Sequence, residues 1–200
     1  MAVPEKVMIP KILAQFNFLD VIILIILFRI CYIAAKMGLS VEIFKLFGVI
    51  FSTYIALHYY TTLSDLIQRR FFPEAMPLEF MDFIIFLLLI ITGYLCFVGL
   101  RSILFRFIQL NAIPKINHFA GLILGIGRGF LTIGLLTFTL AISSVNYLNS
   151  SVKHSYLGSQ AFAISPQTYH WLWNNIFSKF SAHEKFNVTV TEAVDKFNRK

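Results

Sequence analysis

Four long apolar segments dominate this sequence and limit what it can fold into. They run from about Phe18 to Ala35, Ser40 to Tyr60, Phe83 to Leu100 and Asn117 to Ser144, and polar or basic stretches separate them. A helix that crosses a bilayer needs about 20 mostly apolar residues, so each segment is about long enough for one transmembrane helix. The sequence therefore predicts an all-α, polytopic membrane protein with about four transmembrane helices.

Composition excludes a soluble domain and disfavours a nucleic-acid-binding protein. Hydrophobic residues make up 58% of the chain and charged residues only 14%, and the mean hydropathy is +0.74, values far from those of soluble domains. The net charge is +7, but the lysines and arginines flank the apolar segments instead of forming one basic face. We therefore expect the lipid bilayer, with its anionic headgroups, as the partner of these charges, and no nucleic acid.

The chain divides by composition into a four-helix transmembrane domain, residues 1–145, and a polar C-terminal segment, residues 146–200. Residues 61–82, between the second and third apolar segments, contain two prolines and several charges and are expected to form an exposed loop. The short turn between the first two segments predicts an antiparallel helical hairpin.

The C-terminal segment contains one amphipathic helix signal. Ser165 is a candidate N-cap and Pro166 a candidate first helical residue, and the aromatic residues that follow recur at helical spacing. We expect an interfacial helix over about 166–181. The residues expected to anchor it in the headgroup region are Trp171, Trp173, Phe177 and Phe180. The alternative is that this face packs against the bundle or a partner. Beyond His183, where the β-prone run NVTVT occurs, we expect a mobile tail.

The fourth apolar segment has a stripe of small residues along one side. At about 100° per residue, Gly121, Gly125, Arg128 and Thr132 share one helical face. Small residues let a neighbouring backbone approach closely in a membrane. We therefore assign Gly121, Gly125, Gly129 and Thr132 to the packing face, and Ile123, Ile126, Phe130 and Ile133 to the lipid face.

This geometry points Arg128 into the bundle at about mid-membrane depth, where a charge costs about 2.5–3.5 kcal/mol. The candidate carboxylate partners are Asp20 and Glu42, and the competing intramembrane cations are Arg29 and Lys45. Counting residues places each carboxylate about 10–12 Å from Arg128 along the membrane normal, so we expect a small polar cavity. Two interpretations stay open: a structural ion pair or the lining of a hydrated path. Glu42 and Lys45, three residues apart, favour a local pair.

The sequence contains no arrangement that indicates catalysis, a cofactor or a metal ion. The run GIGRG, residues 125–129, neither follows a strand nor opens a helix as a nucleotide-binding loop does. The Ser and His residues form no recognisable nucleophile and base set. We therefore do not expect an enzyme.

The order of four stretches resembles the colicin V production protein family. They are NFLDVIILIIL, VEIFKLFGVI, HFAGLILGIGRGFLTIGLL and SVKHSYLGSQAF, within about Asn17 to Phe162. The resemblance implies a small multi-pass protein of the bacterial inner (cytoplasmic) membrane that is needed for production of the bacteriocin colicin V and is associated with envelope stress. The chain departs from the usual pattern at KMGLSVEI, and where Asn117 and His118 replace an acidic residue before the glycines.

Two functions fit these features. The first is an accessory or scaffold membrane protein that supports toxin production or export and envelope homeostasis through contacts with other membrane proteins. The alternative is a subunit of an oligomeric channel or transporter, since the glycine stripe also suits a homo-oligomer. Basic residues near the segment ends are equally numerous on the two sides, so the positive-inside rule predicts no orientation.

Overall fold

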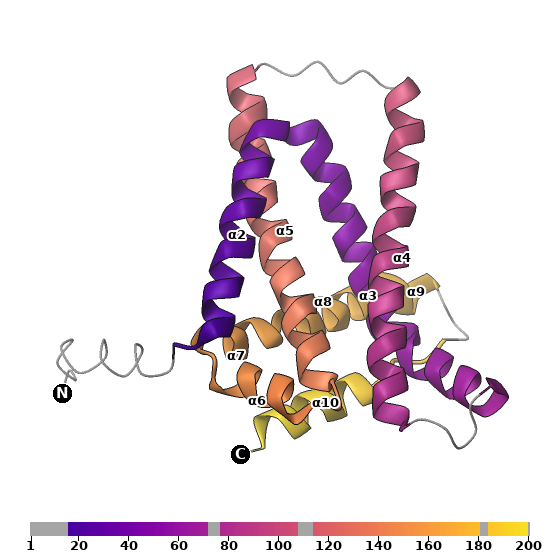
Figure 1. Cartoon of the computed structure of the whole chain (residues 1–200). Coiled ribbons are helices and arrows are strands. Elements are labelled where there is room, and N and C mark those ends of the chain that lie inside the picture. Colours follow the sequence, from indigo (N-terminus) through magenta and orange to yellow (C-terminus); the bar gives the residue numbers. More distant parts are fainter. Residues whose placement is uncertain (1–15, 72–76, 108–113, 181–183, 200) are drawn as a thin grey trace.

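The computed structural model describes residues 16–71, 77–107, 114–180 and 184–199, and these residues are almost entirely helical, without a strand. These residues form four long helices, and each runs antiparallel to the one before it, as Figure 1 shows. They are α2 (Phe18–Met37), α3 (Leu39–Phe71), α4 (Leu78–Phe107) and α5 (Pro114–Ile142). All four are long and apolar enough to cross a membrane. The prediction of an all-α, polytopic membrane protein is confirmed.

The turn between α2 and α3 consists of Gly38 alone. Its φ of 79° is in the left-handed region, which glycine adopts without steric cost. The backbone N–H of Leu39, which opens α3, donates to the Oδ1 of Asn117 at 2.7 Å. His118 contacts the carbonyl oxygen of Ala35 through Nδ1 at 2.7 Å. Residues at the start of α5 therefore hold the hairpin turn, because the turn has no side chain of its own to cap α3.

The expected exposed loop over residues 61–82 is wrong, because helix occupies most of it. α3 continues to Phe71 and α4 begins at Leu78, directly after Pro77, where proline is tolerated because it lies outside the helix interior. Pro73 and Glu74 lie outside the described residues. Ser64 of α3 donates a hydrogen bond to Asp82 of α4. The charges in this stretch therefore lie along two helices instead of interrupting them.

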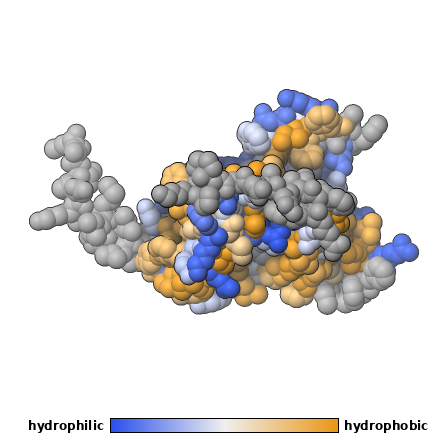
Figure 2. Space-filling view, turned by 90° about the horizontal axis from the view of Figure 1, so that it is seen from above, coloured by the Kyte–Doolittle hydropathy of each residue, from blue (hydrophilic) through white to orange (hydrophobic). Residues whose placement is uncertain are grey.

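Within the bundle, α5 packs against α2 and α3, whereas α4 packs mainly against α3. Large apolar side chains remain exposed on the outside, among them Ile25 and Phe28 of α2 and Leu88 and Leu95 of α4. Figure 2, viewed from above, shows hydrophobic residues around much of the rim of the molecule. Such an exterior is suited to lipid, since acyl chains solvate apolar side chains and water does not.

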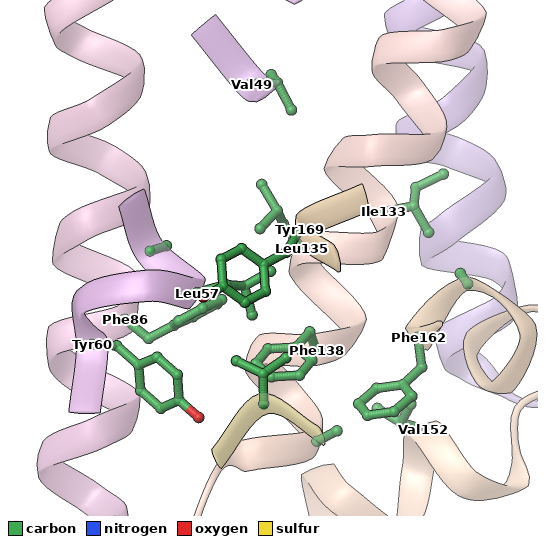
Figure 3. Packing of buried hydrophobic residues seen from close by; sticks show 14 of the residues in the cluster. Val49, Leu57, Tyr60, Phe86, Ile133, Leu135, Phe138, Val152, Phe162 and Tyr169 are labelled. Carbon is green, nitrogen blue, oxygen red and sulfur yellow. The ribbon is translucent and has the colours of Figure 1, made fainter. Parts of the chain in front are cut away.

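The C-terminal segment forms short helices at the end of the bundle where α2 begins and α5 ends (Figure 1). They are α6 (Asn146–His154), α7 (Tyr156–Phe162), α8 (Ile164–Leu172), the π-helical η2 (Trp173–Phe177), α9 (Ser178–Phe180) and α10 (Val188–Asn198). Phe138 of α5 packs between Phe86 of α4 and Phe162 of α7, with ring centroids 5.3 and 5.5 Å apart (Figure 3). One apolar core therefore joins the bundle and these helices.

Two expectations for the C-terminal segment are wrong. Ser165 does not cap a helix, because α8 already begins at Ile164. Instead Ser165 is buried against Gly134 of α5, where a larger residue than glycine would collide with it. The residues after His183 include a docked helix, α10, which Asn187 caps through the N–H of Thr189. Val190 of α10 is buried, and this tertiary contact overrides the β-propensity of NVTVT.

The four expected interfacial anchors separate into two pairs. Phe177 stacks on Tyr54 of α3 with ring centroids 3.5 Å apart, and Trp173 stacks on His58 at 5.3 Å. Trp171 and Phe180 are exposed. The amphipathic stretch, helical from Ile164 to Phe180, thus packs one aromatic pair against the bundle and leaves the other pair on the outside; residue 181 lies outside the described part of the chain.

Candidate functional site

A buried cluster of three charged side chains lies where α3 and α5 meet. The Nε of Arg128 donates to Oε2 of Glu42 at 2.8 Å, and the Nζ of Lys45 donates to Oε1 of the same carboxylate at 2.6 Å. Glu42 is fully buried, and the whole Arg128 residue is 8% exposed. One carboxylate therefore binds both cations, so the local Glu42–Lys45 pair and the pair between helices occur together.

The separation of about 10–12 Å that counting predicted between Arg128 and Glu42 is wrong. Gly121 packs directly on Gly38, so depth along α3 and along α5 can be counted from that contact. Glu42 is four residues beyond Gly38 and Arg128 seven beyond Gly121, which at 1.5 Å per residue puts them about 6 and about 10 Å below it. The two side chains can span this difference of about 4 Å. It is small because the one-residue turn puts the start of α3 directly beside the contact between Gly38 and Gly121.

Three of the glycines of α5 lie against α2 and the Gly38 turn. A Cβ added to Gly121 would meet the backbone of Gly38, one added to Gly125 would overlap the Cβ of Ala34, and one added to Gly129 would meet Leu27. Thr132 differs, since its Oγ1 donates to the carbonyl of Arg128 and its side chain lines a cavity facing α3 and α4. The absence of side chains at the glycines lets α2 and α5 approach closely.

The expected lipid face of α5 needs one correction. Ile123, Ile126 and Phe130 are exposed, but Ile133 is buried in the core. Figure 3 shows Ile133 in the cluster of buried apolar residues. By Ile133, α5 has reached the depth of α7 and α8, which pack against it and replace lipid there.

Asp20 is not the partner of Arg128; it fastens the start of α2 to the C-terminal helices. Its Oδ2 accepts from the backbone N–H of Asn17 in a capping box. Its Oδ1 accepts from Ser155 Oγ and from the N–H of Leu157, both at 2.7 Å. A fully buried carboxylate at a helix N-terminus is thus bound by three donors and favoured by the helix dipole.

Arg29 stands apart from the charge cluster. It lies in the middle of α2 and its side chain is exposed. No salt bridge between residues in the described ranges includes it. The structure therefore brings Glu42, Lys45 and Arg128 together and leaves Asp20 and Arg29 out of that cluster.

A second polar cluster, which the sequence did not indicate, joins α3 to the C-terminal helices. His58 Nδ1 lies 2.9 Å from the hydroxyl of Tyr169, which also accepts from the N–H of Asn187 at 3.0 Å. Glu184 accepts from the hydroxyl of Tyr59 at 2.6 Å. Burial raises the pKa of Tyr169 to about 12, so its hydroxyl keeps its proton near neutral pH. These residues are distant along the chain, so no local pattern indicated that they meet.

A cavity of about 360 Å³ lies between α3, α4 and α5, and Arg128 forms part of its wall. Most of the remaining wall is apolar. No group of three or more His, Cys, Asp or Glu side chains among the residues that the structure describes is placed to hold a metal ion. The chemistry that this region offers is therefore ion pairing and hydrogen-bond donation inside an apolar surrounding.

Comparison with known protein families gives a match over most of the chain. A family model described as Colicin V production protein matches residues 19–165, well over half of the chain. The matched part runs from α2 to the first residues of α8 and so includes the charge cluster, the glycines of α5 and the docked helices α6 and α7. Searches of the curated proteins and of the solved structures found no match.

Proposed function

The chain belongs to the colicin V production protein family, and we propose that it is a scaffold protein of the bacterial inner membrane that supports colicin V production or export and envelope homeostasis. The family match carries this proposal. Its partners would be other membrane proteins, which it would hold or position at the membrane boundary. No catalytic step is assigned to it.

The internal use of charge supports a scaffold role. Glu42 binds both Arg128 and Lys45, and Asp20 binds three donors at the junction with α6 and α7. Removing one member of a buried ion pair is strongly destabilising, so these contacts hold the helices in one arrangement. A rigid bundle with polar helices fixed at one end offers partners a constant surface.

The docked helices α6 and α7 supply such a surface at the end of the bundle. Tyr147, Lys153, His154 and Gln160 are exposed there, while Val152 and Phe162 on the opposite side are buried in the core. The family match extends over both helices. We therefore place the partner-binding surface on the outer side of α6 and α7.

The alternative, an oligomeric channel or transporter subunit, loses the observation on which it rested. The glycines of α5 that suited a homo-oligomer are covered by α2 of the same chain. The scaffold proposal does not need that face to be free.

Complementation tests the proposal. A colicin V producer that lacks its own member of the family would receive the wild-type chain, a His154→Ala/Gln160→Ala variant of the outer surface, or an empty vector. Secreted toxin would be measured as growth inhibition of a sensitive lawn, and envelope integrity as uptake of an impermeant dye. We expect the wild type to restore both and the surface variant to restore neither.

The matched control is Lys179→Ala, which changes an exposed basic residue of α9 beyond the family match. Membrane levels of all chains would be compared by immunoblot, so that a loss of function is separated from a loss of protein. Failure of the wild type to change either readout would refute the proposed role. Full activity of the surface variant would refute the placement of the partner surface.

A further inference from the structure

The cavity between α3, α4 and α5 opens sideways from the bundle. Among its lining residues, Leu87, Ile91 and Leu95 of α4 are also exposed on the outside of the molecule, so they form its mouth. Because α4 packs mainly against α3, its side towards α5 is left open at this depth. The volume of about 360 Å³ is in the range of about 300–1,000 Å³ typical of small-molecule sites.

Arg128 is the strongest hydrogen-bond donor in the wall that is not fully used. A guanidinium has five N–H donors, and within the described residues Arg128 donates only through Nε, to Glu42. The hydroxyls of Ser52, Thr132 and Thr139, which also line the cavity, each donate to a carbonyl of their own helix. The Arg128 side chain is about nine-tenths buried beside this apolar cavity. Its remaining guanidinium N–H groups have no acceptor among the residues that the structure describes.

The charge of the cluster favours an anion at this place. Arg128 and Lys45 are cationic and share the single carboxylate of Glu42, which leaves one positive charge in excess. A buried charge is expensive unless it is paired. An acidic group in the cavity would pair with the excess charge and accept from the free N–H groups in the fork geometry that suits a guanidinium.

We propose that this cavity binds a long-chain carboxylate, with its carboxylate on Arg128 and its hydrocarbon chain between α4 and α5. The apolar mouth matches a hydrocarbon chain, and its lateral opening gives access from the bilayer. A carboxylic acid enters the membrane interior in its neutral form, whereas a phospholipid headgroup is ionised and strongly hydrated. Arg128 lies about 10 Å below the Gly38 turn, which favours the carboxylic acid over a phospholipid.

Photolabelling of the full chain in nanodiscs tests this site. The probe is a palmitic acid with a diazirine in its chain, and labelled positions are found by peptide mass spectrometry. We expect labels on the walls formed by α4 and α5. Palmitate should compete about tenfold better than hexadecanol, which has the same chain without the acid. Labelling elsewhere, or equal competition by the two, would show acyl-chain filling only and overturn the proposal.

Two tryptophan variants separate the cavity from the rest of α4. Ile91→Trp fills the mouth and should abolish labelling, whereas Leu88→Trp, at an exposed position of α4 that does not line the cavity, should leave it unchanged. If phosphatidylglycerol competes as well as palmitate, the ligand of the cavity is a phospholipid and the assignment of a long-chain carboxylate is refuted. The competition by palmitate and hexadecanol uses the wild type alone, so it decides the matter even if Ile91→Trp fails to fold.

Discussion

The substitution Glu42→Gln tests whether the buried carboxylate holds the bundle together. Glu42 is fully buried and accepts from Arg128 at 2.8 Å and from Lys45 at 2.6 Å. Glutamine keeps the shape but leaves two cations without a counter-charge. Breaking a buried pair by removing one partner costs about 3–5 kcal/mol, and we expect a loss of this size in the free energy of unfolding. Helix loss would be followed by circular dichroism during SDS titration in mixed micelles.

Lys45→Met is the matched control. It removes one of the two cations but leaves the pair between Glu42 and Arg128, and the Lys45 side chain is already 13% exposed. One charge-assisted hydrogen bond contributes about 1.5–3 kcal/mol, so this variant should lose less than Glu42→Gln. The reasoning is refuted if Glu42→Gln unfolds within about 0.5 kcal/mol of the wild type, or if Lys45→Met is the more damaging change.

Three further predictions concern helix contacts. Gly125→Ala should lose about 1–3 kcal/mol by overpacking against α2, whereas Gly127→Ala, which meets open space, should stay within about 0.5 kcal/mol of wild type in the same titration; equal losses would contradict this. Asp20→Asn should speed hydrogen exchange in α6 and α7 but not in α4, because it weakens the bonds to that junction. Tyr169→Phe should speed exchange in α10 through about 1–3 kcal/mol of lost hydrogen bonding, and no change would refute the contact. The pKa of Tyr169 in the folded state, about 12, exceeds its ordinary value of 10.0. The contribution of the Tyr169 hydroxyl to the free energy of unfolding of the wild type should therefore be complete below pH 10 and be lost as the pH rises through about 12.

The membrane spans could be predicted because each depends on a local property, the length of an apolar segment. The ends of α3 and α4 could not, since charged residues such as Arg69 and Arg70 at the end of α3 are compatible with helix. The packing of α10 against the other helices could not be predicted from the sequence either. Val190 and Phe197 are too few to form a recognisable core in the sequence, and they become part of one only when Phe162 and Tyr60 are brought beside them.

The charge cluster illustrates a different limit. Helical periodicity puts Arg128 on one side with Gly125, and in the structure this side meets α2 and α3. Periodicity carries no information on how two helices are offset along the membrane normal. That offset is set by the one-residue turn at Gly38 and by its contact with Gly121, and it decides which carboxylate Arg128 reaches.

Arg29 and Arg128 show that depth alone does not determine how a charge is accommodated. Arg29 is nine residues from Gly38 and Arg128 seven from Gly121, so at 1.5 Å per residue their backbones differ in depth by only about 3 Å. Arg128 nevertheless shares a buried carboxylate, while Arg29 is exposed. The difference arises because Arg128 lies on the side of α5 that the glycines bring against its neighbours, whereas Arg29 lies on the side of α2 that faces away. The small residues of α5 therefore do more than allow close packing: they place Arg128 beside the buried carboxylate of Glu42.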